Sequence, residues 1–242
     1  MELLKFIPLY SLLFVGLYQL LSLFKGHQFL NSKAKRADVL SLIYYCISPP
    51  FAIILFTISP KLWQYTLANT MHKHLFLIAV GFYIYSSYLE LTTRKKYDKS
   101  LLIHHVVVSI GMTLMIAQGE YLAMLTSFII LPFTSIFYHL IRLLKASEDD
   151  YSQLIRKTNN WQLPIFIIIR VAFHITVTLL FVYYELKAPL LSTGVFIYSF
   201  ATLAAAFWLN LFWLKKLVYI CKKGKQQLNA SNPQRPAKAA MH

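Results

Sequence analysis

Two adjacent histidines lie in the middle of an apolar stretch of this chain. Residues 98–111 read DKSLLIHHVVVSIG, so His104 and His105 have aliphatic neighbours on both sides. An imidazole can act as a general base or as a nucleophile near neutral pH. A polar side chain inside a membrane helix is costly and usually serves a function. We therefore take the pair as the first candidate for a reaction centre.

A carboxylate and an arginine in other apolar stretches complete a set that suits acyl transfer. Glu90 can fix the orientation of an imidazole, so we group it with the two histidines as catalytic. An arginine can bind a phosphate or stabilise an oxyanion. We expect the following residues to bind substrate: Arg170, His174, His139, Asn210 and Asp98. Asp98 also has the position of an N-cap for the helix that carries the histidine pair.

The elements that position these residues are membrane-spanning helices. The chain has 242 residues, of which 57% are hydrophobic and only 14% are charged. Continuous apolar runs of about 20 residues predict helices rather than barrel strands. Such runs occupy residues 6–24, 39–59, 75–93, 100–117, 121–144, 162–184 and 189–214. The sequence thus predicts an all-α integral membrane protein with a bundle of about seven transmembrane helices.

The basic residues are distributed unequally between the two sides of these helices. Of the 24 lysines and arginines, 19 fall in the connections after helices one, three and five and in the C-terminal tail. The positive-inside rule then places the C-terminus in the cytosol and the N-terminus outside. This asymmetry explains the net charge of +15, and no nucleic-acid-binding motif accompanies it. We expect a multipass protein of the endoplasmic reticulum in a eukaryote, or of the inner membrane in a bacterium.

The same topology gives each polar residue a depth in the membrane. His104 and His105 lie roughly 7–9 Å from the cytosolic end of their helix, while Arg170 and His174 lie roughly 13–19 Å deep at 1.5 Å per residue. The spacing of Arg170 and His174 by four residues also puts both on one helix face. We expect these side chains to meet in the cytosolic half of the bundle.

Prolines and composition divide the chain further. Pro49, Pro50 and Pro132 stand inside expected helices and predict kinks. We expect a leading helix and basic loop over 1–38, a main transmembrane domain over 39–221, and a basic disordered cytosolic tail over 222–242. No HExxH or comparable ligand spacing is present, so we expect no metal site.

Four segments occur in an informative order along the chain. They are KYDKSLLIHHVVVSIG, LPFTSIFYHL, NNW followed by IIIR at 167–170, and FWLNLFWLKKLV. In this order they resemble the TLC-domain family, which includes the ceramide synthases. The resemblance implies a barrel of six helices around a lipid cavity, with one additional leading helix. For ceramide synthases it implies fatty acyl transfer from CoA to an amine, with His104 and His105 at the reaction centre.

One segment departs from the ceramide synthase pattern. Ceramide synthases carry paired aspartates of the form HDxxD on the helix after the histidine pair, whereas that helix here reads FIILPFTSIFYHLIRLL and has no carboxylate. The chain is in this respect more similar to the non-synthase branch, whose members are linked to phospholipid composition, lipid homeostasis or cargo handling.

Three functions remain open on this basis. The first is a role in lipid metabolism or homeostasis, with acyl transfer from acyl-CoA to a lipid acceptor as the specific reaction. The second is a non-catalytic lipid sensor, carrier or cargo receptor. The third is a metal-dependent membrane hydrolase that would use His104, His139 and His174. We expect membrane lipids as partners, acyl-CoA as the candidate co-substrate, no bound cofactor and no nucleic acid; the sequence is compatible with a homodimer.

Overall fold

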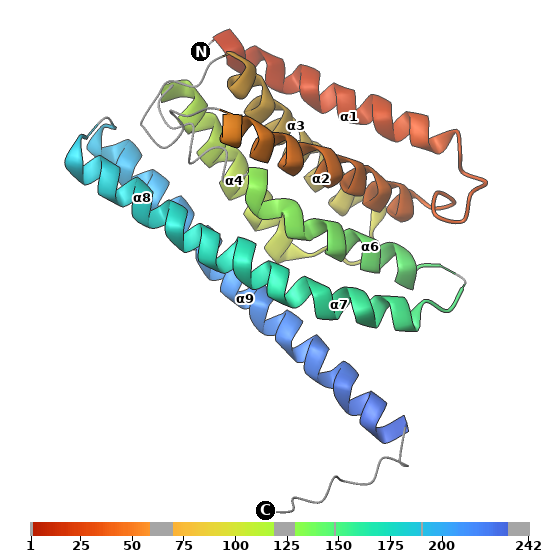
Figure 1. Cartoon of the computed structure of the whole chain (residues 1–242). Coiled ribbons are helices and arrows are strands. Elements are labelled where there is room, and N and C mark those ends of the chain that lie inside the picture. The colour runs from red at the N-terminus through yellow and green to blue at the C-terminus, as the bar shows by residue number, and fades with distance from the viewer. Residues whose placement is uncertain (1, 59–69, 119–128, 148, 190, 232–242) are drawn as a thin grey trace, which may run out of the picture.

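A computed structural model describes residues 2–58, 70–118, 129–147, 149–189 and 191–231. Throughout these ranges the chain forms helices and short connections, with no strand among them. Most of the helices run side by side as an elongated bundle, and the end of the last helix projects away from it (Figure 1). The prediction of an all-α membrane fold is confirmed.

The helices follow one another with short connections. Their bounds are η1 Glu2–Lys5, α1 Phe6–Ser22, α2 Lys33–Ile58, α3 Thr70–Thr93, α4 Lys99–Gln118, η2 Leu131–Thr134, α6 Ser135–Lys145, α7 Ser152–Phe166, η3 Ile167–Phe173, α8 His174–Lys187 and α9 Thr193–Ser231. Segments α7, η3 and α8 form one continuous helical span, Ser152–Lys187. Within the described residues, five helices are long and apolar enough to cross a membrane, and α4 is a shorter apolar helix.

Several helix boundaries differ from those expected from the sequence. Helix α2 begins at Lys33, six residues before the apolar run, so Asp38 lies inside a helix. Helix α9 continues to Ser231, so residues 222–231, which we expected in a disordered tail, are helical. Helices extend beyond their apolar runs because polar residues at their ends meet water and headgroups without breaking the backbone hydrogen bonds. Part of the expected fifth span, 119–128, lies outside the described residues.

Six spans close a ring. Helix α2 packs against α3, α3 against α4, and α4 against α9. Helix α9 packs against the α7–η3–α8 span, which packs against η2 and α6, and α6 returns to α2. The six-helix barrel is therefore confirmed for the described residues.

Helix α1 packs on the outside of this ring, against α2 and α3. At its closest approach to α3 there is no room for a side chain: a Cβ atom on Gly81 would lie 2.9 Å from Tyr10 Cβ and 3.0 Å from the Ser11 nitrogen. The Tyr10 hydroxyl also lies 2.7 Å from His74 Nδ1. The leading helix is thus attached by close backbone contact and by a partly buried polar pair.

Prolines change the helical geometry next to the barrel interior. Pro132 stands in the 3-10 segment η2, and Thr134 and Ser135 follow it at the start of α6. Pro164 lies inside α7, and the π-helical segment η3 begins three residues later and contains Arg170. Proline lacks a backbone N–H, so it removes one hydrogen bond of the helix and favours such local changes. Both irregular segments contribute to the site described below.

One end of the bundle carries the α1–α2, α3–α4 and α6–α7 connections and the last turns of α9, opposite the N-terminus (Figure 1). We call it the basic end, because these connections and the helical turns next to them together hold most of the lysines and arginines of the chain.

Candidate functional site

Arg170 is buried inside the ring and held by three helical segments. Its Nε–H donates to Thr134 Oγ1 at 2.8 Å, Nη2 donates to Ser135 Oγ at 2.9 Å, and Nη1 donates to Asn210 Oδ1 at 3.2 Å. The guanidinium also lies over the ring of Trp213, 5.3 Å from its centroid. No described carboxylate forms an ion pair with it. Arg170 is thus a buried cation with neutral neighbours, and a charge in this setting favours an anionic ligand.

Asn210 of α9 connects this arginine to His174. The Asn210 amide donates to the Arg170 carbonyl at 3.1 Å, and its nitrogen lies 3.2 Å from His174 Nδ1. His174 Nε2 lies 3.1 Å from the carbonyl of Leu203. With Nε2 protonated and Nδ1 accepting, both ring nitrogens have partners. These contacts fasten η3 and α8 to α9.

His104 contacts Trp213, and one of its two ring nitrogens has no hydrogen-bond partner among the described residues. Its ring packs edge-on against Trp213, with centroids 5.3 Å apart, so the indole contacts both His104 and Arg170. The Trp213 Nε1–H donates to Ser100 Oγ near the start of α4. His104 Nδ1 is buried and has no hydrogen-bond partner in the described part of the chain. A buried polar atom without a partner costs free energy, which a ligand or water at this position would recover.

His105 lies against α3. Its Nδ1 is 3.2 Å from Ser87 Oγ, and its ring packs on Tyr83 with centroids 5.1 Å apart. The side chain is only 2% exposed. The two histidines therefore face different surroundings, as expected for neighbours about 100° apart on a helix.

A cavity of about 260 Å³ lies between α4, η2, α6, α7, η3 and α9. Its wall contains both histidines of the pair together with four cationic side chains and one carboxylate. The charged members are Arg142, Lys145, Arg170, Lys216 and Asp98. Apolar and aromatic residues complete the wall, among them Leu101, Phe166 and Trp213. Such a lining suits an amphiphile with an anionic group.

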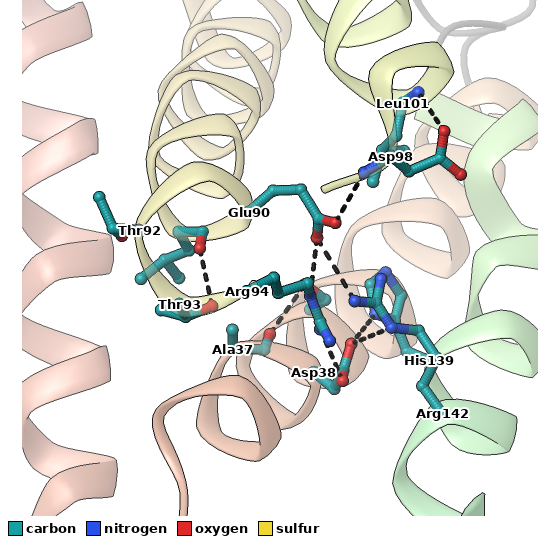
Figure 2. A network of polar contacts seen from close by, with 12 residues as sticks. Ala37, Asp38, Glu90, Thr92, Thr93, Arg94, Asp98, Leu101, His139 and Arg142 are labelled. Carbon is teal, nitrogen blue, oxygen red and sulfur yellow. Dashed lines mark hydrogen bonds and ion pairs between the residues drawn. The ribbon is translucent and has the colours of Figure 1, made fainter. Parts of the chain in front are cut away.

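A second polar group lies between α2, α3 and α6 (Figure 2). Asp38 is 3% exposed and accepts from Arg94 Nη2 at 2.8 Å. The other Asp38 oxygen lies 2.8 Å from His139 Nδ1 and 3.4 Å from Arg142 Nε. Glu90 pairs with Arg94 Nε at 2.9 Å and with Arg142 Nη2 at 3.4 Å. We call these five residues the charge cluster.

The charge cluster also reaches the start of α4. The backbone N–H of Asp98 donates to Glu90 Oε1 at 3.2 Å, as Figure 2 shows. The Asp98 carboxylate accepts from the Ser100 N–H at 2.9 Å and from the Leu101 N–H at 3.4 Å. Asp98 is therefore the N-cap of α4, as the sequence predicted. Through it the cluster fixes the beginning of the helix that carries the histidine pair.

The structure divides the expected site residues into three groups. His104, His105, Arg170 and Asp98 line the cavity. His174 and Asn210 lie beside it and bind one another. Glu90 and His139 belong to the charge cluster, and the described contact to the His105 ring comes from Ser87, three residues before Glu90. The catalytic role of Glu90 stays a prediction, and its observed partners are the two arginines.

Three residues of this arrangement were missed by the sequence reasoning. Asp38 was taken as part of a loop because the apolar run begins at Val39. Arg94 was counted only as a basic loop residue, although it bridges both carboxylates of the charge cluster. Trp213 stands at the end of the Asn-x-x-Trp motif that begins at Asn210, and that motif was the signal for it.

The histidines of the hydrolase alternative do not share a site. His104 contacts Trp213, His139 pairs with Asp38, and His174 pairs with Asn210. Within the described ranges no group of three His, Cys, Asp or Glu side chains is placed to hold a metal ion. The metal-dependent hydrolase therefore has no ligand set in this part of the chain.

A comparison with models of known protein families shows to which family the barrel belongs. The model of the TLC domain matches residues 36–219. The chain belongs to the TLC-domain family. The match begins within α2 and ends within α9, so it covers the six spans of the ring and leaves α1 outside. A search of curated proteins finds no significant match. As a TLC-domain protein with several apolar spans, the chain is a multipass membrane protein with a lipid-related function.

Proposed function

We propose that the TLC barrel binds an amphiphile with an anionic group in its cavity and transfers an acyl group from acyl-CoA to a membrane lipid. The observation that carries this proposal is the free, buried Nδ1 of His104 in the wall of a cavity that also contains Arg170. An imidazole nitrogen without a hydrogen-bond partner, beside a buried cation without an ion pair, costs free energy in the apo protein and has little structural purpose.

The charges of the cavity suit the phosphates of acyl-CoA. Lys145 and Lys216 lie near the basic end, and Arg170 lies deeper. The positive-inside rule makes the basic end cytosolic, where acyl-CoA is found. Among the described residues of the wall, the only carboxylate is that of Asp98, which is occupied in capping α4. A polyanion can therefore approach from this end while its acyl chain contacts the apolar part of the wall.

The His104 imidazole would act first as the general base and then as the general acid of the reaction. His104 takes a proton from the amine or hydroxyl of the acceptor as that atom attacks the thioester carbonyl. The new C–N or C–O bond forms and the C–S bond breaks. The imidazolium returns the proton to the departing thiolate, which leaves as free CoA. The Arg170 guanidinium, held 5.3 Å above Trp213, is positioned to stabilise negative charge in this cavity.

A non-catalytic lipid carrier or sensor is the second candidate. One observation favours it: no described carboxylate contacts His104 or His105, so neither ring has the acidic partner that often orients a catalytic imidazole. A carrier would use the same cavity and the same cationic wall without turnover.

The test compares His104→Gln with the wild type. Acyl transfer predicts that the variant loses about 10²- to 10⁴-fold in the rate of acyl-CoA consumption with an amine or lysolipid acceptor. Its thermal stability should change little, because Nδ1 of His104 makes no hydrogen bond within the described protein that would be lost. The matched control is His27→Gln, on the exposed α1–α2 connection, which should keep full activity. If the wild type consumes no acyl-CoA, the acyl-transfer proposal fails and the non-catalytic carrier or sensor remains.

A further inference from the structure

A groove of about 460 Å³ runs along the seam between α3 and α4. Four aliphatic side chains line it and remain between 38% and 53% exposed: Ile84, Val106, Ile110 and Leu114. Exposed aliphatic side chains in the middle of a membrane span face lipid. The groove therefore opens toward the bilayer, unlike the cavity inside the ring.

Polar atoms interrupt the apolar wall of this groove. Ser109 lines it, is 9% exposed, and has a buried Oγ with no hydrogen-bond partner in the described residues. One turn nearer the basic end, Ser87 and His105 also line the groove and contact each other. An unpaired hydroxyl facing hydrocarbon is costly, so Ser109 fits a ligand that brings its own hydrogen-bonding group.

His105 lines both the groove and the cavity. Its imidazole is thus the partition between the barrel interior and a surface open to the bilayer. The neighbouring Tyr83 supports the ring from the α3 side. A group held in the groove beside His105 would lie next to the contents of the cavity.

We propose that the groove between α3 and α4 binds the hydrocarbon chain of a membrane lipid whose hydroxyl or amine lies at Ser109 and His105. The direction of the groove supports this occupant. Ser87 and His105 lie toward the basic end, whereas Leu114 and Ile7 line the far part. The one described hydroxyl of that far part, on Thr113, already donates to the Ser109 carbonyl within α4. An amphiphile from the bilayer matches this order, with its polar end at His105 and its chain toward the membrane interior.

The lipid in the groove is the acceptor of the acyl group. This assignment rests on the proposed function, whereas binding in the groove does not. The donor enters the cavity from the basic end and the acceptor enters from the side. The two substrates thus approach the histidine pair from different sides of α4, and the hydroxyl or amine of the acceptor passes His105 to reach His104 in the cavity wall.

The experiment uses the full chain in nanodiscs with a photoactivatable monoacylglycerol that carries a diazirine in its chain. Peptide mapping should find the adducts concentrated on α3 and α4. Ile110→Trp fills the groove and should lower this labelling several-fold. The matched control is Ile175→Trp on α8, since Ile175 is 42% exposed, close to the 48% of Ile110. It should leave the labelling of α3 and α4 unchanged.

A second variant tests the polar end of the groove. Ser109→Ala should lower labelling by the hydroxyl-bearing probe and leave labelling by a diazirine alkane unchanged. Labelling spread evenly over the lipid-facing helices, or equal in the Ile110 and Ile175 variants, would overturn the proposal. Concentrated labelling with no acyl-CoA consumption would retain the lipid site and remove its role as acceptor, so the two failures are distinguishable.

Discussion

Asp38 shows how a single buried carboxylate can hold three helices together. It lies on α2, accepts from Arg94, the residue that follows α3, and contacts His139 and Arg142 of α6. Its side chain is 5% exposed, whereas the two arginines are 16% and 17% exposed. The carboxylate is therefore the most enclosed member of the charge cluster, and its loss would leave cations with insufficient compensation.

Replacing Asp38 by asparagine should lower the free energy of unfolding by about 3–5 kcal/mol, the usual cost of removing one partner from a buried ionic group. Thermal unfolding in detergent measures this effect. The control is Asp149→Asn in the exposed α6–α7 connection, where the described partner of the carboxylate is the Tyr151 hydroxyl. It should change stability by less than about 0.5 kcal/mol. Equal midpoints for the two variants would contradict the structural role of the cluster.

Residue types predicted which side chains line the cavity. They did not predict which side chains pair with one another. Arg170, His104 and His105 were recognised because polar groups in apolar helices are expensive, and all three line the cavity. The pairing of His139 with Asp38 could not be predicted, because the carboxylate is 101 residues away in the chain. Helical spacing shows which residues share one face of a helix. Only the packing of the helices decides which neighbouring helix that face contacts.

At the scale of elements, close packing attaches α1 to the barrel. The Gly81 position has backbone and Cβ atoms of α1 at 2.9–3.0 Å from any added Cβ. Because two of those three atoms belong to backbone, they cannot rotate away as a flexible side chain could. The whole of α1 would have to shift.

Gly81→Ala should therefore destabilise the protein by about 1–3 kcal/mol, the typical cost of overpacking. The control is Gly194→Ala at the start of α9, where an added Cβ meets nothing within 4 Å. Alanine there should be neutral or should stabilise the helix by up to about 1 kcal/mol. Unfolding midpoints of the two variants decide the point, and a neutral Gly81→Ala would refute the close contact between α1 and α3.

The sequence predicted the number and type of elements well, because long apolar runs leave few alternatives in a membrane. It could not predict the π-helical turn at η3, since Pro164 indicates a disturbance without its form. That turn changes the register of Arg170 relative to α8, which a regular spacing of four residues does not anticipate. The start of α2 was also placed too late, because hydropathy marks the membrane rather than the helix.

For the whole molecule, the distribution of charge predicts one orientation in the membrane. Single cysteines introduced into the α1–α2 and α6–α7 connections of a chain lacking Cys46 and Cys221 should react with impermeant reagents only from the cytosolic side. A cysteine in the α8–α9 connection, at the opposite end of the bundle in Figure 1, serves as the control and should react from the other side. If either of these two connections at the basic end reacts from outside, the route proposed for acyl-CoA is wrong.

The central claim is that the interior of the barrel is a binding site for an anionic amphiphile. Native mass spectrometry of the purified protein tests it most directly, with two tryptophan variants on α4. Leu101 lines the cavity, whereas Ile103 is 59% exposed on the same helix and lines no part of it. We predict a bound acyl-CoA or anionic lipid on the wild type and on Ile103→Trp, and its loss from Leu101→Trp. An empty wild type, or a ligand that Leu101→Trp retains, would contradict the account.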